Sequence, residues 1–183
     1  KPCSHLMNPE PKCLDHELPI QEVGLSLSRL DSRTLSEGFI ITKEGLYLGM
    51  ANVQDLLAAI TEMQILAARY ANPLTLLPGN VPINSKIDYL IQKKITFTAC
   101  HFDIDRFKPY NDVYGYDLGD EIIRLLGSLI VSYSDTEIDF VGHIGGDDFI
   151  GLYQSKNWME RCTSILHGFD SKIIQYLSEA DLS

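Results

Sequence analysis

The stretch "FVGHIGGDDFIGLY", Phe140–Tyr153, places two glycines and two aspartates between two runs of alternating apolar residues. This pattern predicts a β-hairpin whose tip is Gly145–Asp148. One interpretation is an ordinary tight turn made of soluble residues. The other is a site that needs negative charge to hold a metal ion. In that site Gly146, which has no Cβ, would let a ligand approach the backbone closely.

A second pair of acids, Asp103 and Asp105, ends a predicted strand over Ile95–Asp105. Because side chains alternate along a strand, both carboxylates are expected on one face. If the hairpin lies beside this strand, three or four carboxylates converge and raise one another's pKa. A divalent cation, Mg²⁺ or Mn²⁺, would remove that repulsion, since hard oxygen ligands suit it. Alternatively, Asp105 only caps a helix and Asp120 only adds charge at a helix start.

The rest of the sequence is interpreted as two units, residues 1–66 and 67–183. The first unit is predicted to hold a helix over Pro19–Leu30 and a hairpin over Glu37–Met50 that turns at "KEG". A helix over Asn52–Ala71, which contains no Gly or Pro, then joins the units.

The second unit is predicted to begin with a turn-rich stretch, Asn72–Ile87, which ends the joining helix. Beyond the strand that carries Asp103, helical periodicity covers Leu118–Tyr133, and after the hairpin it covers Trp158–Leu177. The order strand, helix, strand, strand, helix is typical of an α+β fold with a split β-α-β unit.

Composition limits the classes of partner. The formal net charge of −10 argues against binding nucleic acid or an anionic membrane by bulk electrostatics, although Mg²⁺ can bring a single nucleotide to an acidic site. A run of about 18 apolar residues is absent, so a membrane span is not expected. The four cysteines are scattered, which favours reduced thiols and a cytoplasmic location.

Three motifs, in order, resemble those of the GGDEF domain, the diguanylate cyclase family. They are "LTLLPGN" (Leu74–Asn80), "FDIDRFKPYNDVYGYDLGD" (Phe102–Asp120), with Tyr116 where His is usual, and the signature itself, "GGDDF" (Gly145–Phe149), with Asp where Glu is usual. The resemblance begins near Asn72. It implies the α+β, palm-like fold of nucleotidyl cyclases, with a central antiparallel sheet.

The resemblance also implies a metal site and a reaction. Mg²⁺ would be held by the carboxylates of Asp103, Asp147 and Asp148 and by the carbonyl of Ile104. Asp147 and Asp148 would also help to deprotonate the 3′-hydroxyl of one GTP, which attacks the α-phosphate of another and displaces pyrophosphate. Two domains facing each other, each with one GTP, would make cyclic di-GMP, so a homodimer is expected.

Nucleotide recognition follows from the same motifs. Asn111 and Asp120 would read the guanine edge, because an amide and a carboxylate can pair with its O6 acceptor and with its N1 and N2 hydrogens. The other residues expected at the nucleotide are Phe107, Lys108, Tyr116 and Gly146.

Departures from the family pattern define the alternatives. The Asp148 side chain is about 1.5 Å shorter than Glu, and a misplacement of about 1 Å can lower a rate about a hundredfold. The family's Arg-x-x-Asp product-inhibition motif reads Thr136-x-x-Asp139 here, so feedback binding is expected to be lost. The family domain continues with a Ser-x-Gly strand and a last helix not found in this sequence, which predicts a C-terminally incomplete domain.

Two further hypotheses therefore stand beside an active cyclase. The first is a catalytically degenerate GTP-binding domain that regulates a neighbouring signalling domain, for example an EAL phosphodiesterase. The second is a scaffold without a ligand, in which the first unit and the joining helix drive dimerisation.

The first unit resembles a single CBS module, and the whole chain resembles the C-terminal part of bacterial EAL–CBS–GGDEF signalling proteins. Asn52 and Asp55 fall on the CBS ribose-binding pattern, but a helix capping box, with Asp in place of Glu, is the favoured interpretation. His101 and His143 could approach each other as part of a transition-metal site, or they could simply pack in their strands.

Overall fold

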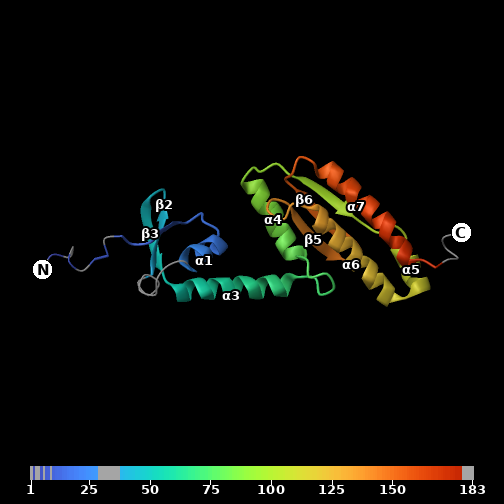
Figure 1. The fold of residues 1–183 in the computed structure, drawn as a ribbon, viewed down its shortest axis with the longest axis horizontal. Helices are drawn as coiled ribbons and strands as arrows, with labels where there is room; N and C mark the ends of the chain where they lie inside the picture. Colours follow the sequence, from blue (N-terminus) through green and yellow to red (C-terminus); the bar gives the residue numbers. More distant parts are fainter. Residues whose placement is uncertain (1, 3–4, 6, 9, 29–37, 179–183) are drawn as a thin grey trace. The chain divides into compact units, whose positions relative to one another are not determined.

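The computed structural model describes residues 2, 5, 7–8, 10–28 and 38–178 (Figure 1). It contains two compact units, Lys1–Leu66 and Ala67–Ser183. Helix α3, Val53–Tyr70, begins in the first unit and ends in the second.

The first unit is built on a three-stranded sheet in the order β1-β2-β3. The strands are β1 (Cys13–Asp15), β2 (Phe39–Lys43) and β3 (Leu46–Ala51), and helix α1 (Ile20–Ser28) lies between β1 and β2 in the chain. Strand β1 is parallel to β2, and β2 is antiparallel to β3. The predicted hairpin is therefore present, and its turn uses positive φ at Glu44 and Gly45. The buried core is Leu14, Leu27, Phe39 and Leu56.

Helix α3 begins with the predicted capping box. The Asn52 side-chain oxygen accepts hydrogen bonds from the backbone N–H groups of Gln54 (2.8 Å) and Asp55 (3.0 Å). In return, the Asp55 carboxylate accepts a hydrogen bond from the Asn52 backbone N–H at 2.9 Å. These bonds satisfy backbone donors that have no partner inside the helix.

The second unit is built on a three-stranded antiparallel sheet in the order β4-β6-β5 (Figure 1). Its strands are β4 (Thr98–Phe102), β5 (Phe140–Gly145) and β6 (Asp148–Tyr153). Its helices are α4 (Asn80–Gln92), α5 (Phe107–Tyr114), α6 (Tyr116–Tyr133), α7 (Trp158–Ile173) and a 3₁₀ turn, Ile174–Tyr176. The predicted hairpin is formed by β5 and β6, and β6 is the central strand.

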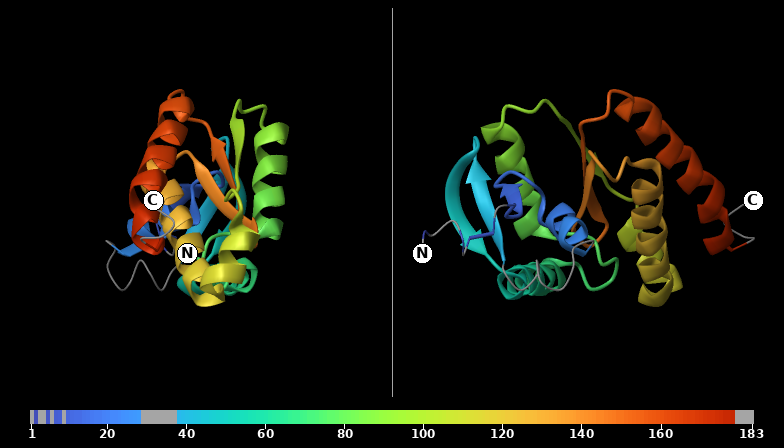
Figure 2. Two further views of the ribbon diagram at one scale, coloured as in Figure 1. Left: turned by 90° about the vertical axis from the view of Figure 1, so that its right-hand side faces the viewer. Right: turned by 60° about the vertical axis from the view of Figure 1, so that its left-hand side comes forward.

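Helices cover both faces of this sheet (Figure 2). On one face, Phe102 and Phe149 pack in a core with apolar side chains of α6 and α7, among them Ile123, Leu126 and Ile165. On the other face, α4 packs so closely that a Cβ on Gly142 would lie 2.4 Å from the Ile83 side chain. The sheet is thus a middle layer, and the hairpin tip extends from its edge.

Three sequence predictions in this unit were wrong. Most of the second half of the turn-rich stretch is helix α4, which accommodates Pro82 because the first N–H groups of a helix need no internal partner. Strand β4 ends at Phe102, so strand alternation does not place Asp103 and Asp105 on one face. Helix α6 begins at Tyr116, and its first-turn acid is Asp117.

The segment between β4 and α6, for which the sequence predicted no element, forms helix α5. Its eight residues include Pro109, which weakened the helical signal in the sequence. The helix carries Tyr110 and Tyr114, whose rings stack at 4.6 Å, and the Tyr110 hydroxyl donates to the Tyr176 carbonyl at 2.8 Å. Tyr116 is 76% exposed at the start of α6.

Two expectations from composition can be compared with the described residues. Among the helices described, none is long and apolar enough to cross a membrane. The cysteines described, Cys13, Cys100 and Cys162, are free thiols, with the Cys100 and Cys162 sulfurs 3.6 Å apart.

Candidate functional site

The hairpin tip is a two-residue connection, Gly146–Asp147, between the paired residues Gly145 and Asp148. Gly146 has a φ of +60°, a conformation that L side chains rarely adopt. A Cβ added there would meet no described atom within 4 Å, so the tip is open to a ligand on that side. Glycine is therefore favoured at this position by backbone conformation, and space remains beside it.

Sheet register brings the acid after β4 to the acids of the tip. Phe102 is paired with Phe149, so the next residues outward along the two strands are Asp103 and Asp148. The pKa of Asp103 is raised, first by loss of water around its carboxylate and then by the charges of Asp147 and Asp148. A proton shared with Asp147 also raises the pKa of Asp103, whereas the neighbouring His101 acts in the opposite direction. The structure therefore brings three carboxylates together at this edge.

The three carboxylates do not form a finished cation cage. Among the described residues, no group of three or more His, Cys, Asp or Glu side chains is arranged to hold a metal ion. The chemistry of the donors nevertheless fits a hard divalent cation, because carboxylate oxygens are the ligands it prefers and a cation would relieve the repulsion at Asp103. Asp105, which was predicted beside Asp103, lies in the following turn.

Asp148 has a partner that the sequence analysis did not find. Its Oδ1 lies 3.0 Å from Nε2 of His101, and both side chains are partly exposed, at 44% and 57%. His101 pairs with Ile150, which follows Asp148 by two residues on β6, so His101 and Asp148 lie on the same face of the sheet. The pairing depends on the register between β4 and β6, which the sequence pattern did not specify.

The amide of Asn111 lies where helices α5 and α6 meet. Its Oδ1 is buried and has no hydrogen-bond partner among the described residues. A Cβ on Gly119 would lie 1.9 Å from this oxygen, so the amide occupies space that only glycine leaves free. Asp120, the second predicted guanine-reading residue, follows Gly119 directly. Gly119 thus leaves room for a candidate site residue, a role that the sequence pattern did not reveal.

The remaining predicted ligand residues lie around the turn between β4 and α5. Phe107 and Ile104 both pack against the core, and the Ile104 carbonyl accepts a hydrogen bond from the Phe107 N–H at 3.2 Å. In this structure the Phe107 N–H is therefore used in a hydrogen bond within the protein and does not point outward to a phosphate. Lys108 is exposed on the first turn of α5. Arg106, before the helix, has a φ of +59°.

His143 lies inside the protein, with 1% of its surface exposed. Strand β6 separates β5 from β4, so His143 and His101 belong to strands that are not neighbours. The register also places them on opposite faces, because His143 pairs with Phe149 and His101 pairs with Ile150. The alternative of a shared transition-metal site is therefore not supported by the structure.

Asp139 belongs to the altered product-inhibition motif, and its carboxylate accepts hydrogen bonds from other residues of the same unit. Its side chain is fully buried. The carboxylate accepts hydrogen bonds from the backbone N–H groups of Asp135 (3.0 Å), Gln154 (2.9 Å) and Ser155 (3.1 Å), and from the Ser155 hydroxyl (3.0 Å). Burial acts to raise the pKa of Asp139, but these hydrogen bonds outweigh it and lower the pKa.

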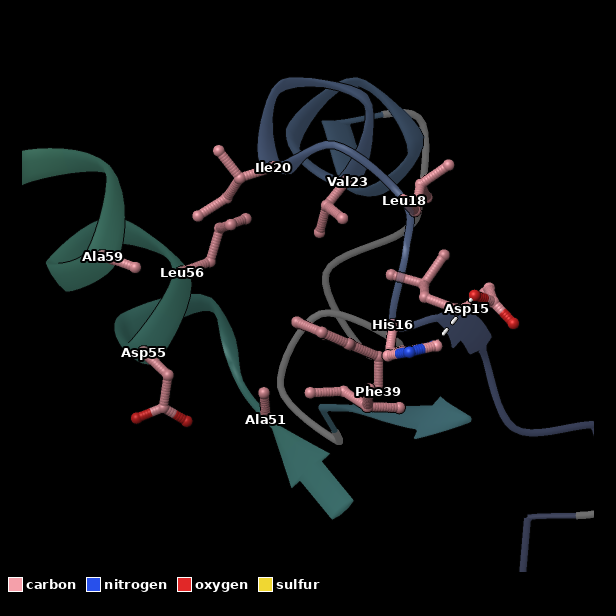
Figure 3. A pocket seen from close by; sticks show the side chains of 12 residues that line it. Asp15, His16, Leu18, Ile20, Val23, Phe39, Ala51, Asp55, Leu56 and Ala59 are labelled. Atoms are coloured by element: carbon pink, nitrogen blue, oxygen red, sulfur yellow. Dashed lines mark hydrogen bonds and ion pairs between the residues drawn. The ribbon is translucent and has the colours of Figure 1, made fainter. Parts of the chain in front are cut away.

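The first unit contains a cavity of about 230 Å³ between its sheet, α1 and α3. Figure 3 shows Ile20 and Leu56 pointing toward each other in this cavity, whereas the carboxylate of Asp55 points away from them. Because Asp55 also accepts the capping hydrogen bond, its geometry is that of a helix start.

Comparison with known proteins identifies the family of the second unit. A family model described as "Diguanylate cyclase, GGDEF domain" matches residues 70–176. This chain belongs to the GGDEF domain family. The match confirms the resemblance drawn from the three motifs. It begins at residue 70, so the CBS resemblance of the first unit stays a prediction.

The GGDEF domain has relatives among curated proteins. The chain is 32% identical to diguanylate cyclase DgcZ of Escherichia coli (strain K12) over 91 residues, which are 49% of this chain and 30% of that protein. It is 26% identical to the bifunctional diguanylate cyclase/cyclic di-GMP phosphodiesterase MucR of Pseudomonas aeruginosa over 150 residues, 80% of this chain and 20% of that protein. The chain therefore spans less than a third of the length of either relative.

Solved structures of GGDEF proteins share the fold. The S helix–GGDEF–EAL structure of Vibrio cholerae LapD, bound to c-di-GMP, has a TM-score of 0.56 at 18% identity and covers 63% of this chain and 30% of that chain. Diguanylate cyclase SiaD from P. aeruginosa, in complex with its activator SiaC, has a TM-score of 0.52 at 20% identity and covers 81% and 57%. These similarities confirm the predicted α+β GGDEF fold.

Proposed function

We propose that the GGDEF domain of this chain binds GTP with Mg²⁺ or Mn²⁺ and condenses two GTP molecules into cyclic di-GMP. The observation that carries the proposal is the convergence of Asp103, Asp147 and Asp148 at one edge of the sheet, with the pKa of Asp103 raised. Such a cluster of negative charge is costly unless a cation or a proton neutralises it.

The proposed cation ligands are the carboxylates of Asp103, Asp147 and Asp148, with the carbonyl of Ile104. A bound cation would neutralise phosphate charge and polarise the α-phosphate of GTP. The protein groups would do the rest: Asp147 and Asp148 would accept the proton of the attacking 3′-hydroxyl, and the open side of Gly146 would let the nucleotide approach the tip.

Guanine recognition is assigned to Asn111 and Asp120. The buried Oδ1 of Asn111 lacks a partner among the described residues, and the N1 and N2 hydrogens of guanine are donors that would satisfy it. Phe107 and Lys108 at the start of α5, with Tyr116, are proposed at the phosphates and ribose. Each chain has one such set of residues, so a second copy is proposed to bring the second GTP.

A second candidate function is a GTP-binding domain that has lost turnover and regulates a neighbouring signalling domain. The observation that favours it is the contact between Asp148 and His101, whose Oδ1 and Nε2 atoms lie 3.0 Å apart. This pair holds the signature acid, already one methylene shorter than Glu, toward β4. A carboxylate held in this way is less free to accept a proton from the substrate.

GTP incubation of the full chain with Mg²⁺ or Mn²⁺ distinguishes the two candidates. Wild type is compared with Asp103→Asn and with Asp117→Asn, an exposed acid of α6 that serves as control. Cyclic di-GMP from wild type and Asp117→Asn, but not from Asp103→Asn, supports the cyclase. Saturable GTP binding without product supports the regulatory domain. A folded protein that neither binds GTP nor forms product contradicts both.

The first unit is proposed to be a CBS-like regulatory module, followed by α3 as the linker. Its support is the order of strands and helices and the apolar cavity beside Leu56. A cytoplasmic location and an upstream signalling domain in a longer protein are proposed with it.

A further inference from the structure

The buried ring of His143 has a partner at each nitrogen. Nδ1 lies 2.9 Å from the hydroxyl oxygen of Thr75, and Nε2 lies 2.9 Å from the carbonyl oxygen of Gly146. A carbonyl oxygen can only accept a hydrogen bond, so the proton is on Nε2. Nδ1 of the neutral ring then accepts a hydrogen bond from the Thr75 hydroxyl.

These contacts hold the residues on both sides of the signature acids. Gly146 directly precedes Asp147, and Phe149, which stacks on the His143 ring at a centroid distance of 4.2 Å, directly follows Asp148. Phe149 is itself fully buried. The ring therefore links the carbonyl at the exposed tip to an immobile side chain of the core.

Thr75 belongs to a turn that is fixed by hydrogen bonds to its backbone groups. The Asn72 side-chain oxygen accepts hydrogen bonds from the N–H groups of Leu74 (2.8 Å) and Thr75 (3.3 Å). The N–H of His143 donates to the Pro78 carbonyl at 2.8 Å. Thus the turn before α4 is attached to β5 by the backbone of His143 and to the hairpin tip by its ring.

We propose that Thr75 and His143 form a positioning pair that fixes the Gly146 carbonyl and thereby the carboxylates of Asp147 and Asp148. Neither residue is required to touch the substrate. The effect of the pair on cation and GTP affinity rests on the proposed function, whereas its effect on the order of the tip does not.

The test uses the full chain and three variants. Thr75→Val keeps the shape of the side chain but removes the hydroxyl, and Thr75→Ser restores the hydroxyl. Ser134→Ala is the matched control, because Ser134 is also half-buried and its hydroxyl also bonds within the protein, to the Ile130 carbonyl at 2.7 Å. The readouts are amide hydrogen exchange at Asp147 and Asp148, and Mn²⁺ affinity.

In Thr75→Val, exchange at the two tip amides should be about tenfold faster and Mn²⁺ binding about three- to tenfold weaker, the scale of one lost hydrogen bond. Thr75→Ser should stay within about twofold of wild type. Ser134→Ala should leave both readouts unchanged. Tip exchange in Thr75→Val equal to wild type, or accelerated to the same extent by Ser134→Ala, would overturn the proposal.

The two proposals can fail separately. If wild type binds neither Mn²⁺ nor GTP while Thr75→Val still accelerates exchange at the tip, the proposed function is wrong and the positioning pair stands. If wild type binds both ligands and Thr75→Val leaves amide exchange at Asp147 and Asp148 unchanged, the positioning pair is wrong and the nucleotide site stands.

Discussion

At the scale of single residues, Asn111 combines a structural cost with a proposed binding role. Its buried Oδ1 has no partner among the described residues, and such an acceptor costs about 1–3 kcal/mol. Gly119 makes this arrangement possible, because any larger residue would collide with the amide. Stability alone therefore gives no reason for an asparagine at this position.

For Asn111→Ala we expect a loss of GTP affinity with little change in the free energy of unfolding. The free energy of unfolding should stay within about 1 kcal/mol of wild type, because lost packing and a removed unsatisfied acceptor oppose each other. GTP affinity should fall about tenfold or more, since guanine donors would be left unpaired. Urea unfolding and calorimetric GTP titration measure the two effects. Asn157→Ala, at the start of α7, is the control, and unchanged GTP affinity in Asn111→Ala would contradict the prediction.

Asp139 predicts an acid-dependent contribution to stability. Its folded pKa lies below the ordinary value of 3.8 because hydrogen bonds outweigh burial. The carboxylate therefore stabilises the fold fully above that value, and this contribution disappears as pH falls through the lower folded pKa. Asp139→Asn should cost about 2 kcal/mol at pH 7, and the difference from wild type should shrink by pH 3.

Urea unfolding of both proteins at pH 7 and pH 3 measures this difference. Asp117→Asn, an exposed acid in the first turn of α6, should cost less than about 1 kcal/mol at pH 7, the scale of a charge at a helix N-terminus. A cost for Asp139→Asn that is equal at both pH values would show that its ionised form is not the stabilising one.

At the scale of secondary-structure elements, β4 and the β5–β6 hairpin bring like charges together. The pKa of Asp103 is raised, so its ionised form destabilises the fold at neutral pH, and this cost is relieved as pH falls through the folded pKa. Removing the charge should therefore stabilise the metal-free protein.

For Asp103→Asn we expect a higher melting temperature than wild type in the presence of a chelator. Mn²⁺ at about 100 times its dissociation constant should stabilise wild type by about 2.7 kcal/mol and Asp103→Asn far less. Thermal unfolding with and without Mn²⁺ tests both statements. A variant that is less stable than wild type without metal would refute the repulsion inferred between β4 and the hairpin tip.

The sequence was most informative where local chemistry determines structure. Alternating apolar residues around two glycines identified the hairpin, and the spacing of Asn52 and Asp55 identified the start of α3. Helix α4 and helix α5 were missed because each contains a proline near its start, which removes helical signal without preventing a helix.

The candidate site was predictable in its residue types but not in its contacts. The acids Asp103, Asp147 and Asp148 were found from spacing. The partners of His101 and His143 were not, because strand register and side-chain rotamers are set by the packing of the whole domain. The space at Gly119 was missed for the same reason, since it depends on how α5 crosses α6.

At the scale of the whole molecule, the described residues form two separate hydrophobic cores. The smaller core has four buried residues around Phe39, and the larger has eight around Phe149. All proposed nucleotide and metal ligands, from Asp103 to Asp148, belong to the second unit. Ligand binding should therefore stabilise one core directly.

We expect calorimetric unfolding of the full chain to give two transitions, because two small cores do not form one cooperative unit. GTP with Mn²⁺ should shift only the transition of the second unit, by an amount that grows with ligand concentration. Leu56→Ala, in the core of the first unit, assigns the other transition and should lower it. A single transition that moves as a whole with GTP would contradict this prediction.

The burial of Phe149 determines which register of strand β6 the sheet can adopt. Phe149 follows Asp148 on the central strand, and successive side chains on a strand point to opposite faces. A slip of one residue would turn the acid toward the α6–α7 core and the ring toward the face that α4 packs against, where a Cβ on Gly142 would already lie 2.4 Å from Ile83. The wrong register would therefore carry a large penalty. Burial of Phe149 therefore fixes the strand register that places Asp148 beside Asp103. Loosened packing around Phe149 should reduce ligand binding before the domain unfolds.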